Sequence, residues 1–96
     1  MENVKHYSSF IKRIITAPEP IKVKLLKSSN PKIITAITEI IYNIINKNIK
    51  VSAANLTQLR KFKKVFYKLV SAKAAARKQI LLDNPSCLVP LKPLFK

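Results

Sequence analysis

Positively charged side chains recur at helical spacing in the segment RKFKKVFYKLVSAKAAARK, which begins at Arg60. Arg60, Lys64 and Lys68 follow one another at intervals of four residues, so a helix stacks them on one face. Like charges at this spacing repel, and no Asp or Glu occurs between residues 40 and 82 to offset them. Such a stripe suits a polyanion, whose counterions are released as its phosphates are neutralised. The alternative is a solvated helix face, on which acidic residues are usually interspersed.

We therefore expect phosphate contacts from a set of basic residues and base stacking from one tyrosine. The basic set is Arg60, Lys61, Lys64, Lys68, Lys73, Arg77 and Lys78. Tyr67 lies near Arg60 and Lys64 in helical angle and could stack on a base, although a tyrosine at a helix edge is more often a boundary residue. Lysine predominates, and its point charge suits phosphate, whereas the arginine fork suits guanine. This favours binding without sequence preference.

The same sequence lacks the residue groups that catalysis or metal binding requires. The acidic residues are scattered over separate segments: Glu2, Glu19, Glu39 and Asp83. His6 is the one histidine, and Cys87 is the one cysteine, so an internal disulfide and a cysteine-based metal site are excluded. A chain without Gly cannot form a glycine-rich phosphate loop. We expect neither an enzyme nor a cofactor.

Length and composition indicate one small folded unit. The chain has 96 residues, a net charge of +15 and 48% hydrophobic residues, which is too apolar for a disordered basic tail. The first ten residues contain no apolar signal core, and no stretch approaches the roughly 20 apolar residues of a spanning helix. We expect an interior compartment: cytoplasm, nucleus or a particle assembled there.

Clusters of Pro, Asn and Ser divide the chain into four or five helices. The expected helices are residues 3–16, 21–27, 31–46, 53–70 and a last one through Leu82, after a kink near Ser71. The alanine-rich run also permits one long helix from Ala53. Asn30 and Ser52 are expected N-caps, and the isoleucine-rich helix 31–46 is the expected centre of the core. In the second helix, Ile21 and Leu25 are expected inside, with Leu26 as a further candidate. Lys22, Lys24 and Lys27 are expected outside.

The predicted fold is all-α, a compact bundle of four to five helices with an extended, Pro-containing apolar C-terminal tail. The basic helical domain spans residues 1–84 and the tail residues 85–96. Pro90 and Pro93 exclude a regular helix there, so its apolar side chains must be buried on the bundle or on a partner. Membrane activity of the tail is the weakest of the functions considered.

A sharper DNA hypothesis is a helix-turn-helix. It would consist of helix 31–46, the turn NKNIK and a recognition helix beginning SAANLTQLRK. Asn55 and Gln58 are residue types that contact base edges from the start of such a helix. The glycine usual in the turn is missing.

The chain resembles a family of small basic proteins of Polinton/Maverick elements and adintovirus-like viruses. The resemblance lies in Glu39 with Ile40 and Asn43, the turn 48–52, the Lys-rich run 60–68 and the segment 77–82. Family members usually have Gly in the turn and Gly-Gly before the tail, where this chain has Asn48 and Asn84-Pro85-Ser86. The resemblance implies a role like that of the core proteins of adenovirus-like particles, in the host nucleus or the virion interior.

These observations predict a non-enzymatic protein that binds nucleic acid, with DNA favoured over RNA, and that packages or organises a viral or transposon genome. The alternative is a virion structural or interaction protein that forms homo-oligomers or binds an acidic surface of another virion protein. Both predictions require the basic residues to lie on a defined, solvent-exposed surface of a folded domain.

Overall fold

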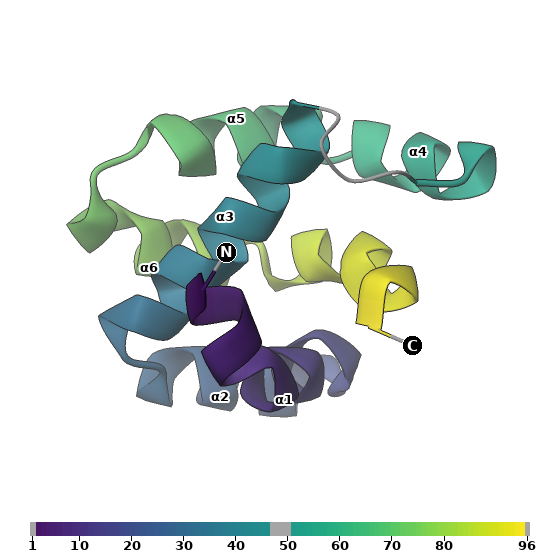
Figure 1. Cartoon of the computed structure of the whole chain (residues 1–96). Helices are drawn as coiled ribbons and strands as arrows, with labels where there is room; N and C mark the ends of the chain where they lie inside the picture. Colours follow the sequence, from purple (N-terminus) through teal and green to yellow (C-terminus); the bar gives the residue numbers. More distant parts are fainter. Residues whose placement is uncertain (1, 47–50, 96) are drawn as a thin grey trace.

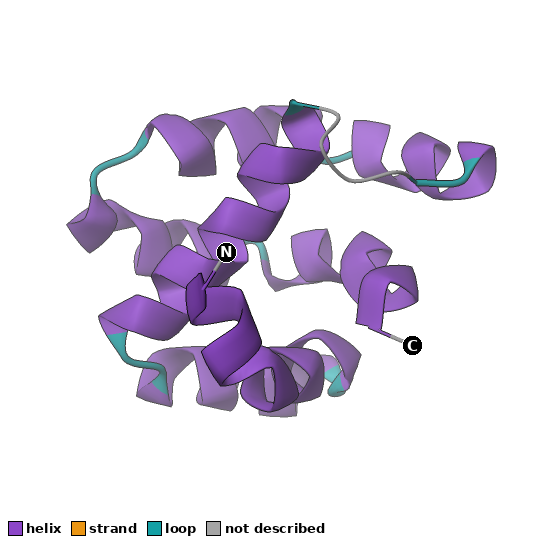
Figure 2. Cartoon of the chain, in the orientation of Figure 1, coloured by secondary structure: helices purple, strands orange, loops and turns teal. Residues whose placement is uncertain are grey.

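The computed structural model describes residues 2–46 and 51–95, and all regular structure within them is helical (Figures 1 and 2). The elements are α1 (Glu2–Thr16), α2 (Glu19–Ser28), α3 (Pro31–Ile45), α4 (Ala53–Arg60), α5 (Lys63–Ser71), α6 (Ala74–Asp83) and the 3-10 helix η1 (Pro85–Phe95). The all-α class is confirmed. The described residues contain more helices than the four to five expected.

Helix α3 runs through the middle of the molecule and packs against α1, α5 and α6 (Figure 1). Its isoleucines at helical spacing form the centre of the core: Ile33, Ile34, Ile37, Ile40 and Ile41 are all buried. The helix begins where expected, because the Asn30 side chain accepts a 3.0 Å hydrogen bond from the amide of Ile33. Pro31 occupies the first turn, where its missing N–H needs no partner.

Helix α2 is rotated relative to the sequence-based expectation. Ile21 is 50% exposed, whereas Lys22 is only 2% exposed and Leu26 is fully buried. Residues 22 and 26 share one face at a spacing of four, and this face packs against α1, α6 and η1. The expectation of Ile21 inside and Lys22 outside was wrong, because burial of Leu26 fixes the rotation of the helix. The aliphatic stem of Lys22 is therefore part of the packed face.

The Lys-rich segment is broken at Lys61 and Phe62, where one continuous helix was expected. The amide of Lys61 bonds to the carbonyl of Gln58 at 3.2 Å and that of Phe62 to Leu59 at 3.1 Å, a tight turn between α4 and α5. The break lets α4 pack on η1 while α5 packs on α3 and α6. The break expected near Ser71 is confirmed by the end of α5 at that residue.

The C-terminal segment is helical, so the extended tail expected from its prolines was wrong. Proline fixes φ near −65°, a value that a 3-10 helix accommodates, and the three-residue turn brings Leu88 and Leu91 to one side. Both leucines and Cys87 are fully buried, and η1 packs against α1, α2, α4 and α6. The buried apolar residues of η1 thus belong to the same hydrophobic core as those of the helices before Asn84.

Candidate nucleic-acid interface

Helix α5 separates its apolar and cationic side chains onto opposite sides. Phe66 and Leu69 are buried in the core, at 3% and 0% exposure. Lys64 and Lys68 lie one turn apart on the exposed side. Tyr67, 51% exposed, lies on the same side. Because its apolar side is anchored in the core, α5 presents these groups on a fixed support.

Lys63 belongs with these residues, although the sequence analysis did not select it. Its side chain is exposed, and its ammonium lies 5.9 Å from the centre of the Tyr67 ring, within the range of a cation–π contact. The spacing of four residues between Lys63 and Tyr67 was visible in the sequence. It was missed because the selected cations lie opposite the apolar arc, whereas Lys63 is only about 60° from Phe66 in helical angle, at the edge of that arc.

Three further predicted residues are exposed at the two ends of α5. Arg60 ends α4, Lys61 lies in the tight turn, and Lys73 precedes α6. The break places Arg60 on a different helix from Lys64, so the predicted stack now extends only from Lys64 to Lys68. We call the exposed cations on and beside α5 the α5 basic surface: Arg60, Lys61, Lys63, Lys64, Lys68 and Lys73.

Arg77 and Lys78, the last two predicted phosphate contacts, are partly buried and make other contacts. The ammonium of Lys78 donates hydrogen bonds to the main-chain carbonyls of Lys27 and, at 3.1 Å, Ser29. Arg77 lines a cavity of about 240 Å³ between α3 and α6, together with Glu39. Sequence spacing could not reveal these roles, because the partners lie in distant segments. We therefore leave both residues out of the α5 basic surface.

The helix-turn-helix hypothesis loses one of its two base-contacting residues. Ser52 caps α4 as expected, accepting a 3.2 Å hydrogen bond from the amide of Asn55. Asn55 is only 8% exposed, so its side chain is not presented to a base edge, whereas Gln58 is exposed. Most of the turn NKNIK lies outside the described residues.

Positive charge is not confined to this surface. Exposed basic side chains also occur on α1, at Lys12 and Arg13, and on α2, at Lys24 and Lys27. These helices lie on the opposite side of α3 from α5 (Figure 1). A charge-matched comparison between the two sides can therefore be made within one molecule.

Metal binding and cysteine chemistry have little support in residues 2–46 and 51–95. No group of three or more His, Cys, Asp or Glu side chains there could hold a metal ion. The thiol of Cys87 is buried, and desolvation raises its pKa from 9.0 to about 12, so it is a poor nucleophile. No helix in the same residues is both long and apolar enough to cross a membrane. Comparisons with protein-family models, curated proteins and solved structures find no match to the chain.

Proposed function

We propose that this protein binds nucleic-acid phosphate, chiefly that of DNA, through the α5 basic surface and without catalysis or sequence preference. The proposal rests on the separation of buried apolar and exposed cationic side chains on α5. Its core side is buried at Phe66 and Leu69, while Lys63, Lys64 and Lys68 are exposed in a stretch without acidic residues. A folded helix that holds cations in place against their mutual repulsion is suited to a polyanionic partner.

The predominance of lysine supports binding to the backbone. An exposed ammonium on a flexible stem can reach a phosphate from many directions and does not require one base sequence. The resemblance to basic proteins of Polinton/Maverick elements and adintovirus-like viruses gives this activity a biological setting. In that setting the protein packages or organises a viral or transposon genome in the host nucleus or the virion interior.

A salt series tests the electrostatic nature of the binding. Gel shifts with a random-sequence duplex, a single strand and an RNA are measured between about 50 and 200 mM salt. If all the cations of the α5 basic surface engage duplex phosphate, log K falls against log salt with a slope of about −5. Binding that is independent of salt contradicts the proposal, and a preference for one duplex sequence contradicts its lack of specificity.

Charge reversal locates the site. The variant Arg60→Glu/Lys64→Glu/Lys68→Glu is compared with Lys12→Glu/Arg13→Glu/Lys24→Glu, which reverses the same number of exposed charges on α1 and α2. The first variant is expected to lose affinity strongly and to reduce the salt slope by about 3. The second is expected to lose less, through the change in net charge alone. Equal losses in the two variants would place the binding elsewhere.

A further inference from the structure

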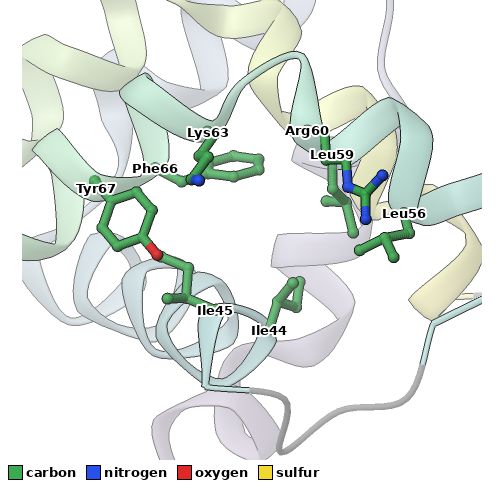
Figure 3. A pocket seen from close by; sticks show the side chains of 8 residues that line it. All are labelled: Ile44, Ile45, Leu56, Leu59, Arg60, Lys63, Phe66 and Tyr67. Carbon is green, nitrogen blue, oxygen red and sulfur yellow. The ribbon is translucent and has the colours of Figure 1, made fainter.

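An apolar cavity of about 150 Å³ opens where α3, α4 and α5 meet (Figure 3). Its apolar walls come from the end of α3 and from the two helices of the Lys-rich segment. The side chains are Ile44, Ile45, Leu56, Leu59 and Phe66. Leu56 is 39% exposed, so part of this apolar lining is open to solvent. This part of the apolar lining is therefore accessible to a side chain of a partner.

The opening of the cavity carries positive charge on two sides. In Figure 3 the guanidinium of Arg60 lies beside Leu56, while the ammonium of Lys63 lies across the opening with Tyr67. Arg60, Lys63 and Tyr67 are all exposed. The cavity therefore combines an apolar floor with a cationic rim, and its occupant must match both features.

Size and polarity limit the occupant to a single apolar side chain. A volume of about 150 Å³ is below the roughly 300–1,000 Å³ typical of sites for drug-sized ligands. The floor contains no polar side chain to pair with the edge of a nucleobase, so a base buried there would have only the rim residues Arg60, Lys63 and Tyr67 as hydrogen-bond partners. A leucine or phenylalanine side chain has no such requirement.

The positive charge around the opening determines which kind of polypeptide bears the inserted apolar side chain. Carboxylates beside it would pair with Arg60 and Lys63, and residues 40–82 of this chain supply no Asp or Glu of their own. A second copy of the chain, with a net charge of +15, would be repelled. We propose that the cavity docks an acidic segment of a partner protein, which inserts one large apolar side chain and sets its carboxylates against Arg60 and Lys63.

This inference goes beyond nucleic-acid binding and can be tested separately. The probe is a fluorescently labelled synthetic peptide of glutamate and serine with one central phenylalanine, and its control has serine in place of that phenylalanine. Fluorescence anisotropy is expected to show about tenfold tighter binding of the phenylalanine peptide, because a buried aromatic anchor dominates such contacts. Equal affinity of the two peptides would mean attraction by charge alone and would overturn the proposal.

Two exposed apolar residues provide matched variants. Leu56→Ser alters the cavity wall, whereas Ile21→Ser removes an exposed apolar side chain from α2. Only Leu56→Ser is expected to abolish the advantage of the phenylalanine peptide, and circular dichroism checks that both variants fold. Duplex DNA affinity is expected to be unchanged in Leu56→Ser, so failure of the peptide site and failure of DNA binding are distinguishable. Loss of single-strand binding in Leu56→Ser without loss of peptide discrimination would assign the cavity to a nucleic acid.

Discussion

The ammonium of Lys78, in the middle of α6, donates a 3.1 Å hydrogen bond to the main-chain carbonyl of Ser29, at the end of α2. A second hydrogen bond from the same ammonium reaches the carbonyl of Lys27. The last carbonyls of a helix have no partner within it and lie at its negative end, so a lysine there satisfies them and interacts favourably with the helix dipole. One basic side chain thus joins two helices that are far apart in the sequence.

Lys78→Met is therefore expected to lower the free energy of unfolding by about 1.5–3 kcal/mol, the contribution of hydrogen bonds that involve a charged group. Urea unfolding followed by circular dichroism measures the change. Lys64→Met, on the exposed side of α5, is expected to change stability by less than about 0.5 kcal/mol but to weaken DNA binding. If Lys78→Met instead weakened DNA binding and left stability unchanged, the original prediction of a phosphate contact at Lys78 would stand.

Glu39 and Arg77 face the same cavity with one unsatisfied polar atom each. Oε2 of Glu39 and Nε of Arg77 are buried without a hydrogen-bond partner among the described residues. Opposite charges that line one cavity attract each other, more strongly when they are partly buried than in bulk water. Removal of one charge leaves the other partly buried without that compensation.

Arg77→Met is accordingly expected to destabilise the fold more in the wild-type background than in a Glu39→Gln background. Urea unfolding of the two single variants, the double variant and the wild type gives the interaction free energy, expected to lie between about 0.5 and 3 kcal/mol. Additive effects would show that the two side chains act independently. A loss of DNA affinity in Arg77→Met as large as that in Lys64→Met would restore Arg77 to the nucleic-acid interface.

Helix α3 shows what the sequence could predict. Its isoleucine spacing fixed both the helix and the buried face, and Asn30 with Pro31 marked its start by local chemistry alone. Ser52 marked the start of α4 in the same way. Features determined within one helical turn were therefore accessible without a structure.

Features determined by distant segments were not accessible. The break at Lys61 contains neither Pro nor Gly and arises because α4 packs on η1 while α5 packs on α3. The burial of Lys22 depends on η1, which was expected to be extended. Lys78 was assigned to phosphate because its carbonyl partners at residues 27 and 29 cannot be inferred from local spacing. Tertiary packing thus decided which predicted cations remained exposed.

Tyr67 and Tyr42 offer a matched test of base stacking, because each is 51% exposed. Tyr67 lies on the α5 basic surface, whereas Tyr42 is on α3. Tyr67→Leu is expected to weaken single-strand binding by about 1–3 kcal/mol, the usual contribution of base stacking on an aromatic ring, and to leave duplex binding almost unchanged. Tyr42→Leu serves as the control in the same anisotropy titration. Equal effects of the two substitutions would exclude Tyr67 as a stacking platform.

Lys22 is a buried cation whose replacement should stabilise the protein. Desolvation, and then the positive charge of Lys92, lower the pKa of Lys22 below its ordinary value of 10.5. The unfolded chain therefore binds more protons between the lowered pKa and 10.5, and wild-type stability rises with pH across this window. Lys22→Met is expected to unfold at higher urea at neutral pH, and its advantage should shrink towards pH 10.5. A stability gain of Lys22→Met that does not change with pH would show that it does not arise from the lowered pKa of Lys22.

Cys87 makes the free energy of unfolding fall with rising pH, whereas Lys22 makes it rise, so the two effects can be separated. Burial raises the pKa of its thiol from 9.0 to about 12, so the stability due to the protonated thiol is complete below pH 9 and is lost as pH rises towards 12. Alanine cannot titrate, so the difference in unfolding free energy between wild type and Cys87→Ala should fall by up to about 1.4 kcal/mol per pH unit in this window. Repeating the comparison in a Lys22→Met background removes the neighbouring ammonium, which lowers the thiol pKa. The fall should then continue to a higher pH than in the wild-type background. A difference that stays constant between pH 9 and 12 would mean that the folded thiol titrates as it does in the unfolded chain.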